Sequence, residues 1–181
     1  MIFMYKALAI LLLSALLLVS PAGAEGYTAP EDGAPMTLEG DMGLLIGGKW
    51  FPILNDFAPL KAALGDPLDM NAAPSCVFKG EDKEFLYDGM TVYTNPLGEM
   101  DVWFEAYIDG EGFTTSRGIG IGAAESEILA AYGDRYYSEG EGMMTYSLSS
   151  DPTDYASPCI IFTLSEGAVV TIDLYYPTNT L

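Results

Sequence analysis

The chain lacks histidine altogether and has only 7 Lys and Arg residues against 26 Asp and Glu among its 181 residues, for a formal net charge of −19. Without histidine, Ser-His-Asp catalysis, Cys-His catalysis and His-ligated zinc are excluded. So few basic side chains cannot form the patch that nucleic acid or an anionic membrane surface requires. Hydrophobic residues nevertheless make up 50% of the chain, which predicts a folded protein.

Residues 1–24 have the pattern of a cleaved secretory signal peptide. Lys6 precedes an apolar run from Ala7 to Val19, and Ser20-Pro21 leads into the cleavage site Ala22-Gly23-Ala24. A retained membrane anchor is the alternative, but a span needs about 20 apolar residues and this run is shorter. We therefore expect a secreted or cell-surface protein with no membrane insertion after cleavage. Residues 25–43 mix proline, glycine and acids without an apolar period, which predicts a flexible acidic leader.

The rest of the chain matches itself at a shift of 68 residues. This shift sets 60–66 on 128–134, where Ala-Ala is followed by Gly-Asp in both segments. With no gap adjustment, it also sets the apolar segment 99–108 on 167–176. Two matches in one register predict a duplicated unit, with repeat 1 at 44–112 and repeat 2 at 113–181.

Each repeat is predicted to form a short helix followed by antiparallel strands, so the fold class is α+β. One helix starts at Asn55 or Asp56 and closes at Gly65, and the other covers 124–132 and ends at Gly133. The period-two pattern predicts strands at 76–79, 84–87, 91–94, 102–108, 143–148, 159–164 and 169–176. Each helix should pack on one face of its strands, in a shared or adjoining sheet.

Two stretches resemble known families. Gly118-Ile119-Gly120-Ile121-Gly122 followed by Glu125, Ile128-Leu129 and Tyr132-Gly133 resembles the helix unit of tandem-repeat β-lactamase-inhibitor-like proteins, a unit also seen in small outer-membrane assembly lipoproteins. The stretch 74–87 is similar to uncharacterised secreted proteins and lipoproteins of Gram-positive gut bacteria. The resemblance implies repeated halves with helices on one face of a sheet. Ala123 departs from the usual capping Ser or Asp, and the lipoproteins' lipid-attachment cysteine is missing.

Two cysteines, Cys76 and Cys159, fall in different predicted repeats. In an exported protein an even cysteine count favours a disulfide, which here would join the two halves. The alternative is two buried thiols that pack as small apolar groups.

The matching strands 102–108 and 170–176 supply the candidate binding face. Alternation predicts that Val102, Phe104, Ala106 and Ile108, with their repeat 2 counterparts Val170, Ile172, Leu174 and Tyr176, face the helices. The opposite face would then carry an aromatic and acidic set: Trp103, Glu105, Tyr107, Thr171, Asp173 and Tyr175. Aromatic rings beside carboxylates are typical of protein-contact or glycan-contact surfaces, although aromatic residues also favour strands anywhere.

Other motifs have weaker support. Gly118-x-Gly120-x-x-Ala123 matches a dinucleotide fingerprint but lacks a preceding buried strand. The acidic turns 109–112 and 139–141 lack the spacing of a calcium-binding EF-hand loop, so solvated turns are the simpler interpretation. We expect no cofactor and no metal.

The sequence predicts a secreted, non-enzymatic protein-binding or inhibitor-like module whose partner is an unknown protein, basic or amphipathic, or a cell-wall glycan. The alternative is a carboxylate-based cell-wall or glycan hydrolase, or its accessory domain, because two of the 26 acids could form a catalytic pair.

Overall fold

The computed structural model describes residues 27–138, 140–149, 151 and 153–178. The signal peptide predicted over 1–24 lies outside the described residues. The fold is α+β, with these elements in chain order: α1 (Leu38–Asp41), β1 (Gly43–Ile46), β2 (Lys49–Pro52), α2 (Phe57–Leu64), β3 (Asp69–Pro74), β4 (Glu81–Tyr87), β5 (Met90–Leu97), β6 (Met100–Ile108), α3 (Glu125–Tyr132), β7 (Met143–Ser147), β8 (Cys159–Ser165) and β9 (Ala168–Tyr175).

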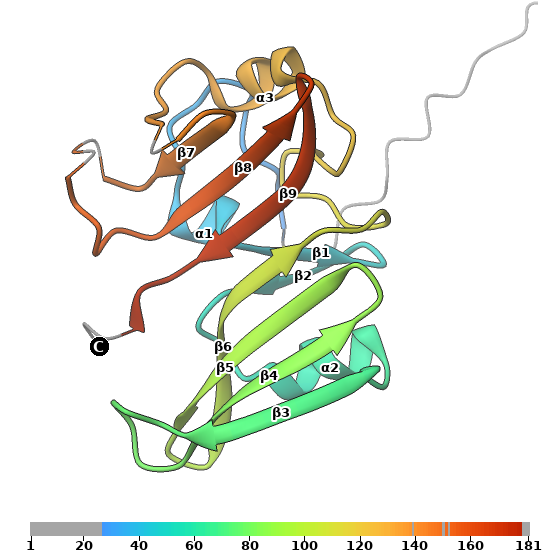
Figure 1. Ribbon diagram of the computed structural model, residues 1–181, viewed down its shortest axis with the longest axis vertical. Helices are drawn as coiled ribbons and strands as arrows, with labels where there is room; N and C mark the ends of the chain where they lie inside the picture. Colours follow the sequence, from blue (N-terminus) through green and yellow to red (C-terminus); the bar gives the residue numbers. More distant parts are fainter. Residues whose placement is uncertain (1–26, 139, 150, 152, 179–181) are drawn as a thin grey trace, which may run out of the picture.

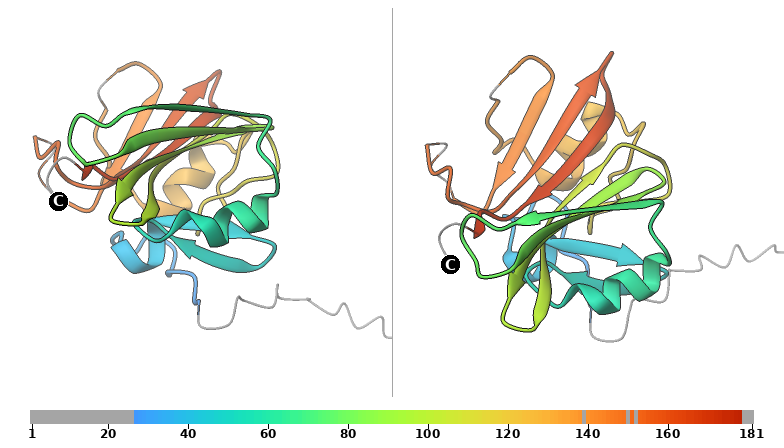
Figure 2. Two further views of the ribbon diagram at one scale, coloured as in Figure 1. Left: turned by 90° about the horizontal axis from the view of Figure 1, so that it is seen from below. Right: turned by 60° about the horizontal axis from the view of Figure 1, so that its bottom comes forward.

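The main sheet has seven antiparallel strands in the order β3-β4-β5-β6-β9-β8-β7. Short turns join β4 to β5 and β8 to β9, whereas β6 and β9 pair although they are far apart in the sequence. The helices and the β1-β2 hairpin lie on one side of this sheet, as Figures 1 and 2 show. The other side carries no helix among the described residues, and this open face is a shared surface of both halves of the chain.

A single hydrophobic core fills the space between the sheet and its one-sided cover. Leu44 and Phe51 from the hairpin, Leu60 from α2 and Ile128 from α3 are all buried in it. Burial of large side chains is the main favourable term in folding. Because the cover and the sheet share one core, we expect the described residues to unfold together.

The two longer helices begin and end in similar ways. The Asp56 carboxylate accepts a hydrogen bond from the Ala58 N–H at the start of α2. At the start of α3, Ala124 has no capping side chain, and Glu127 instead accepts from the Ala124 N–H at 2.7 Å. Gly65 and Gly133 end the helices at φ 86° and 79°, a region that favours glycine. A shift of 68 residues carries the bounds of α2 onto those of α3.

Residues 27–43 belong to the fold, so the prediction of a flexible leader over 25–43 is wrong for this part. Asp41, at the end of α1, and Arg117 form an ion pair of 2.7 Å with both side chains fully buried. The Arg117 guanidinium also donates to the carbonyls of Ala34 and Ala131. We call residues 27–42 the strap, since Arg117 joins them to the end of α3. Sequence pattern could not reveal it, because one ion pair between distant residues has no periodic signal.

Two element predictions also need correction. The segment 76–79 is a turn, and the strand preceding β4 is β3, whose residues are all exposed. The β1-β2 hairpin was not predicted either, because its glycines at 47 and 48 separate two strands of only four residues. No helix in the described part of the chain is long and apolar enough to cross a membrane.

Candidate binding face

The central strands β6 and β9 bring the predicted acids and tyrosines together. Glu105 lies opposite Tyr175 and Tyr107 lies opposite Asp173 in the antiparallel register. Directly opposed residues in such a pair have their Cβ atoms about 4.5–5.5 Å apart, within reach of cross-strand contact. Thr171, the remaining β9 residue of the predicted set, is half-buried opposite Thr163 of β8. The open face therefore contains two opposed acid–tyrosine pairs at the centre of the sheet.

Trp103 does not belong to this face, and its prediction is wrong. The pairing of β5 with β6 shifts between Tyr93–Glu105 and Thr94–Trp103, which leaves Phe104 as an extra residue. Such a β-bulge reverses the alternation of side chains beyond it. Trp103 is consequently only 1% exposed in the core, while Phe104, predicted to face the helices, lies half-buried on the open face.

A second bulge changes the β9 prediction in the same way. The pairing of β8 with β9 shifts between Thr163–Thr171 and Leu164–Val169, so Val170 is the extra residue. Val170 is exposed and Val169 is buried, the reverse of the predicted alternation at this end of the strand. Ile172 and Leu174, beyond the bulge, are buried in the core as predicted.

Burial raises the pKa values of the two acids in the opposed pairs, Glu105 and Asp173. Desolvation raises the pKa of Glu105 to about 7, with a further contribution from the nearby Asp173 carboxylate. Desolvation alone raises the pKa of Asp173 to about 6. The Asp173 Oδ1 atom is buried and has no hydrogen-bond partner among the described residues. These carboxyl groups are thus partly removed from water, and no ion pair among the described residues compensates their charge.

The acid–tyrosine pattern continues from β6 towards the β3 edge. Glu84 of β4 lies opposite Tyr93 of β5, and Tyr93 lies opposite Glu105 of β6. Burial, followed by the charge and hydrogen bond of Glu84, raises the pKa of Tyr93 to about 12. Together with Tyr175, these residues make a continuous row across four strands. Glu84 and Tyr93 were missed in the sequence because alternation shows which residues share a face of a strand but not which strands are neighbours.

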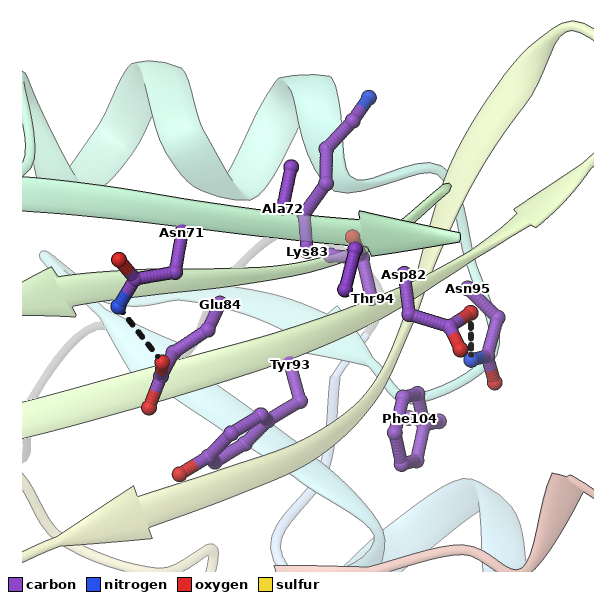
Figure 3. A pocket seen from close by; sticks show the side chains of 10 residues that line it. Asn71, Ala72, Asp82, Lys83, Glu84, Tyr93, Thr94, Asn95 and Phe104 are labelled. Carbon is purple, nitrogen blue, oxygen red and sulfur yellow. Dashed lines mark hydrogen bonds between the residues drawn. The ribbon is translucent and has the colours of Figure 1, made fainter. Parts of the chain in front are cut away.

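A hollow of about 220 Å³ lies beside this row. In Figure 3, Asn71, Glu84, Tyr93 and Phe104 project to one side of the strands, while Lys83 projects to the other. The Asn71 amide donates to the Glu84 carboxylate at 2.9 Å. Lys83 instead pairs with Asp101 at 2.6 Å. Lys83 is among the residues that line the hollow, but its ammonium group is paired with Asp101 and does not neutralise Glu84.

The predicted disulfide is absent, since Cys76 and Cys159 are not bonded to each other. Cys76 is exposed in the turn between β3 and β4. Cys159 is buried at the start of β8, where it pairs with Tyr175 of β9 and Ser147 of β7. The number of cysteines alone could not show that one is exposed and the other is buried.

The described residues contain no group of three or more Asp, Glu or Cys side chains placed to hold a metal ion. The glycines 118, 120 and 122 form a turn before α3 and follow no parallel strand, so they lack the context of a dinucleotide site. Comparisons of this chain with protein-family models, curated proteins and solved structures find no match.

Proposed function

We propose that this chain is a secreted, non-enzymatic binding protein whose open sheet face docks a partner protein through that partner's basic side chains. The observation that carries the proposal is the pair of acids, Glu105 and Asp173, which are partly desolvated at the centre of this face and form no ion pair within the described part of the chain. A lysine or arginine from a partner would supply the missing charge. The tyrosines opposite these acids would contribute buried area around the ion pair.

Charge complementarity makes a basic partner the occupant of this face. The chain carries a formal charge of −19, so its long-range field attracts cationic surfaces and repels a second copy of itself. Both ion pairs of the described residues, Lys83–Asp101 and Arg117–Asp41, involve acids other than Glu105 and Asp173. The acids on the open face thus remain available to charges from outside the chain.

We also propose that the fold is two tandem repeats, related by the 68-residue shift. The shared shift of α2 and α3 supports this arrangement, as does the pairing of β6 with β9. In this arrangement Glu105 and Asp173 are equivalent positions, and so are Tyr107 and Tyr175. The repeat thereby accounts for two acid–tyrosine pairs of the same kind on one face.

Site-specific photo-cross-linking tests the docking proposal. Benzoylphenylalanine in place of Tyr107, which is 36% exposed, should cross-link a secreted protein in the culture medium, at a peptide that contains Lys or Arg. The cross-link should disappear when Glu105→Gln and Asp173→Asn are added. The same cross-linker at Tyr155, exposed on the β7-β8 loop, is the control. Equal yield at Tyr155, or persistence of the cross-link in the double variant, would contradict the proposal.

A carboxylate-based glycan hydrolase is the second candidate function, favoured by the raised pKa values of Glu105 and Asp173. A carboxyl group of pKa about 7 can donate a proton near neutral pH, and glycosidases combine such an acid with a second, ionised carboxylate that acts as base or nucleophile. Against this candidate, the pair lies on a sheet face between tyrosines and does not line the neighbouring hollow. Release of reducing ends from purified peptidoglycan by the natural sequence, with loss in Glu105→Gln, would favour the hydrolase over the docking module.

A further inference from the structure

A second cavity, separate from the row on the open face, lies where the strap meets the end of α3. Its volume is about 480 Å³, within the range of about 300–1,000 Å³ typical of small-molecule sites. Gly33, Pro35 and Met36 of the strap form one wall, and residues 132–137 and 146–149 form the others. The cavity thus depends on the Asp41–Arg117 ion pair that holds the strap in place.

Tyrosine is the dominant side chain around this cavity. Tyr132, Tyr136, Tyr137 and Tyr146 all line it, which is 4 of the 12 tyrosines in the chain. The Tyr146 ring lies between two others, with its centroid 5.1 Å from that of Tyr132 and 5.8 Å from that of Tyr136. Because the Tyr146 hydroxyl donates to the Gly133 carbonyl, this ring is fixed in position. Tyr132 and Tyr146 are buried in the core, whereas Tyr136 is 37% exposed and Tyr137 is half-buried, so the last two are the rings that a ligand can reach.

One acid and one base accompany the tyrosines. Asp134 and Arg135 both line the cavity and both are exposed. The pKa of Tyr146 is raised chiefly by burial and further by Tyr136, Asp134 and Glu125, so negative charge lies near the central ring. The buried Tyr132 ring already has a cation over it, since the Arg117 guanidinium lies 4.7 Å from its centroid.

We propose that this cavity binds a small organic cation of the alkylammonium class, with the accessible rings of Tyr136 and Tyr137 against its methyl groups and Asp134 beside its charge. Aromatic faces attract cations that lie within about 6 Å of the ring centroid, and quaternary ammonium ligands are bound by such aromatic cages. The acidic character of the whole chain adds attraction for a cation. Arg135 opposes it, so the two neighbouring charged residues should have opposite effects on affinity.

The first test compares two ligands of the same shape. Choline and its neutral isostere 3,3-dimethylbutan-1-ol differ mainly in charge, and each is titrated into the purified protein while its methyl resonance is followed by NMR. We expect the choline signal to move upfield, in the ring currents of the tyrosines, and to saturate. The neutral alcohol should bind at least about tenfold more weakly. Equal affinities, or no choline shift, would overturn the proposal.

The second test uses exposed side chains, whose replacement leaves the core intact. Tyr136→Leu should weaken choline binding by about tenfold, whereas Tyr155→Leu, outside the cavity, should leave it unchanged. Asp134→Asn should weaken binding and Arg135→Gln should strengthen it. Circular dichroism of each variant establishes that it is folded. If Arg135→Gln weakens binding, or if Tyr136→Leu has no effect in a folded variant, the assignment of this site is wrong.

Discussion

Ala106 of β6 lies directly opposite Leu174 of β9, and the two residues are 68 positions apart in the sequence. This is also the spacing between α2 and α3. On either side of Ala106–Leu174, an acid of one strand faces a tyrosine of the other. The two halves of the chain therefore contribute similar side chains to the centre of the open face.

The first prediction concerns the bulge in β6, which decides the face on which neighbouring rings lie. Trp103→Ala should lower the free energy of unfolding by about 3–5 kcal/mol, because this ring is fully buried in the core. Phe104→Ala, on the open face, should cost less than about 2 kcal/mol. Urea unfolding curves of both variants measure the difference. A larger loss for Phe104→Ala than for Trp103→Ala would contradict the observed register.

The second prediction concerns the buried ion pair that anchors the strap. Asp41→Ala should lower the free energy of unfolding by about 3–5 kcal/mol, because the Arg117 charge would remain buried without its partner. Asp101→Ala is the matched control, since its pair with Lys83 is about one-third exposed and contributes at most about 1 kcal/mol. Thermal and urea unfolding of both variants give the comparison. Equal losses would show that burial does not distinguish the two pairs.

The third prediction is that both cysteines are thiols. Denatured, unreduced protein should label at two sites with a maleimide, as mass spectrometry would show. In the native protein Cys76 should label rapidly and Cys159 only on unfolding, because the first is exposed and the second buried. If neither cysteine is labelled in the denatured, unreduced protein, the two form a disulfide and this prediction is wrong.

Local sequence signals predicted α2, α3 and six of the seven strands of the main sheet, because helix caps and alternation act over a few residues, but they missed α1. They could not give the two bulges. Val102, Trp103 and Phe104 are all apolar and all favour strands, so the sequence does not show which of them point into the core. The strap depends on Arg117 meeting Asp41 across 76 residues, a contact that no local pattern specifies.

For the candidate face, the sequence identified the acids and tyrosines of β6 and β9 but not their partners. Glu84 and Tyr93 join the row only because β4 and β5 lie beside β6 in a fixed register. Which strands are neighbours, and in which register, is determined by the packing of the whole sheet and not by any one strand. The desolvation of Glu105 and Asp173 likewise comes from surrounding side chains on several strands, so composition alone could not indicate it.

The last prediction is a pH dependence that follows from the two raised carboxyl pKa values. In the unfolded chain Glu and Asp titrate near pH 4, whereas in the folded protein the pKa of Glu105 is about 7 and that of Asp173 about 6. Between these limits the folded state binds more protons than the unfolded state. Stability from these groups is therefore fully present below about pH 4 and is lost as the pH rises through 6 to 7.

Unfolding free energies from pH 4 to 8 should show this loss in the natural sequence and a smaller loss in the Glu105→Gln, Asp173→Asn variant. The double variant Asp109→Asn, Glu111→Gln, at two exposed positions between β6 and α3, controls for the change of two units in net charge. Docking of a basic partner should have the opposite trend, because only ionised carboxylates attract a cation. If affinity for the basic partner increases from pH 5 to 8 while the free energy of unfolding decreases, both effects arise from Glu105 and Asp173. If the natural and doubly substituted chains have parallel pH profiles, neither effect comes from these two side chains.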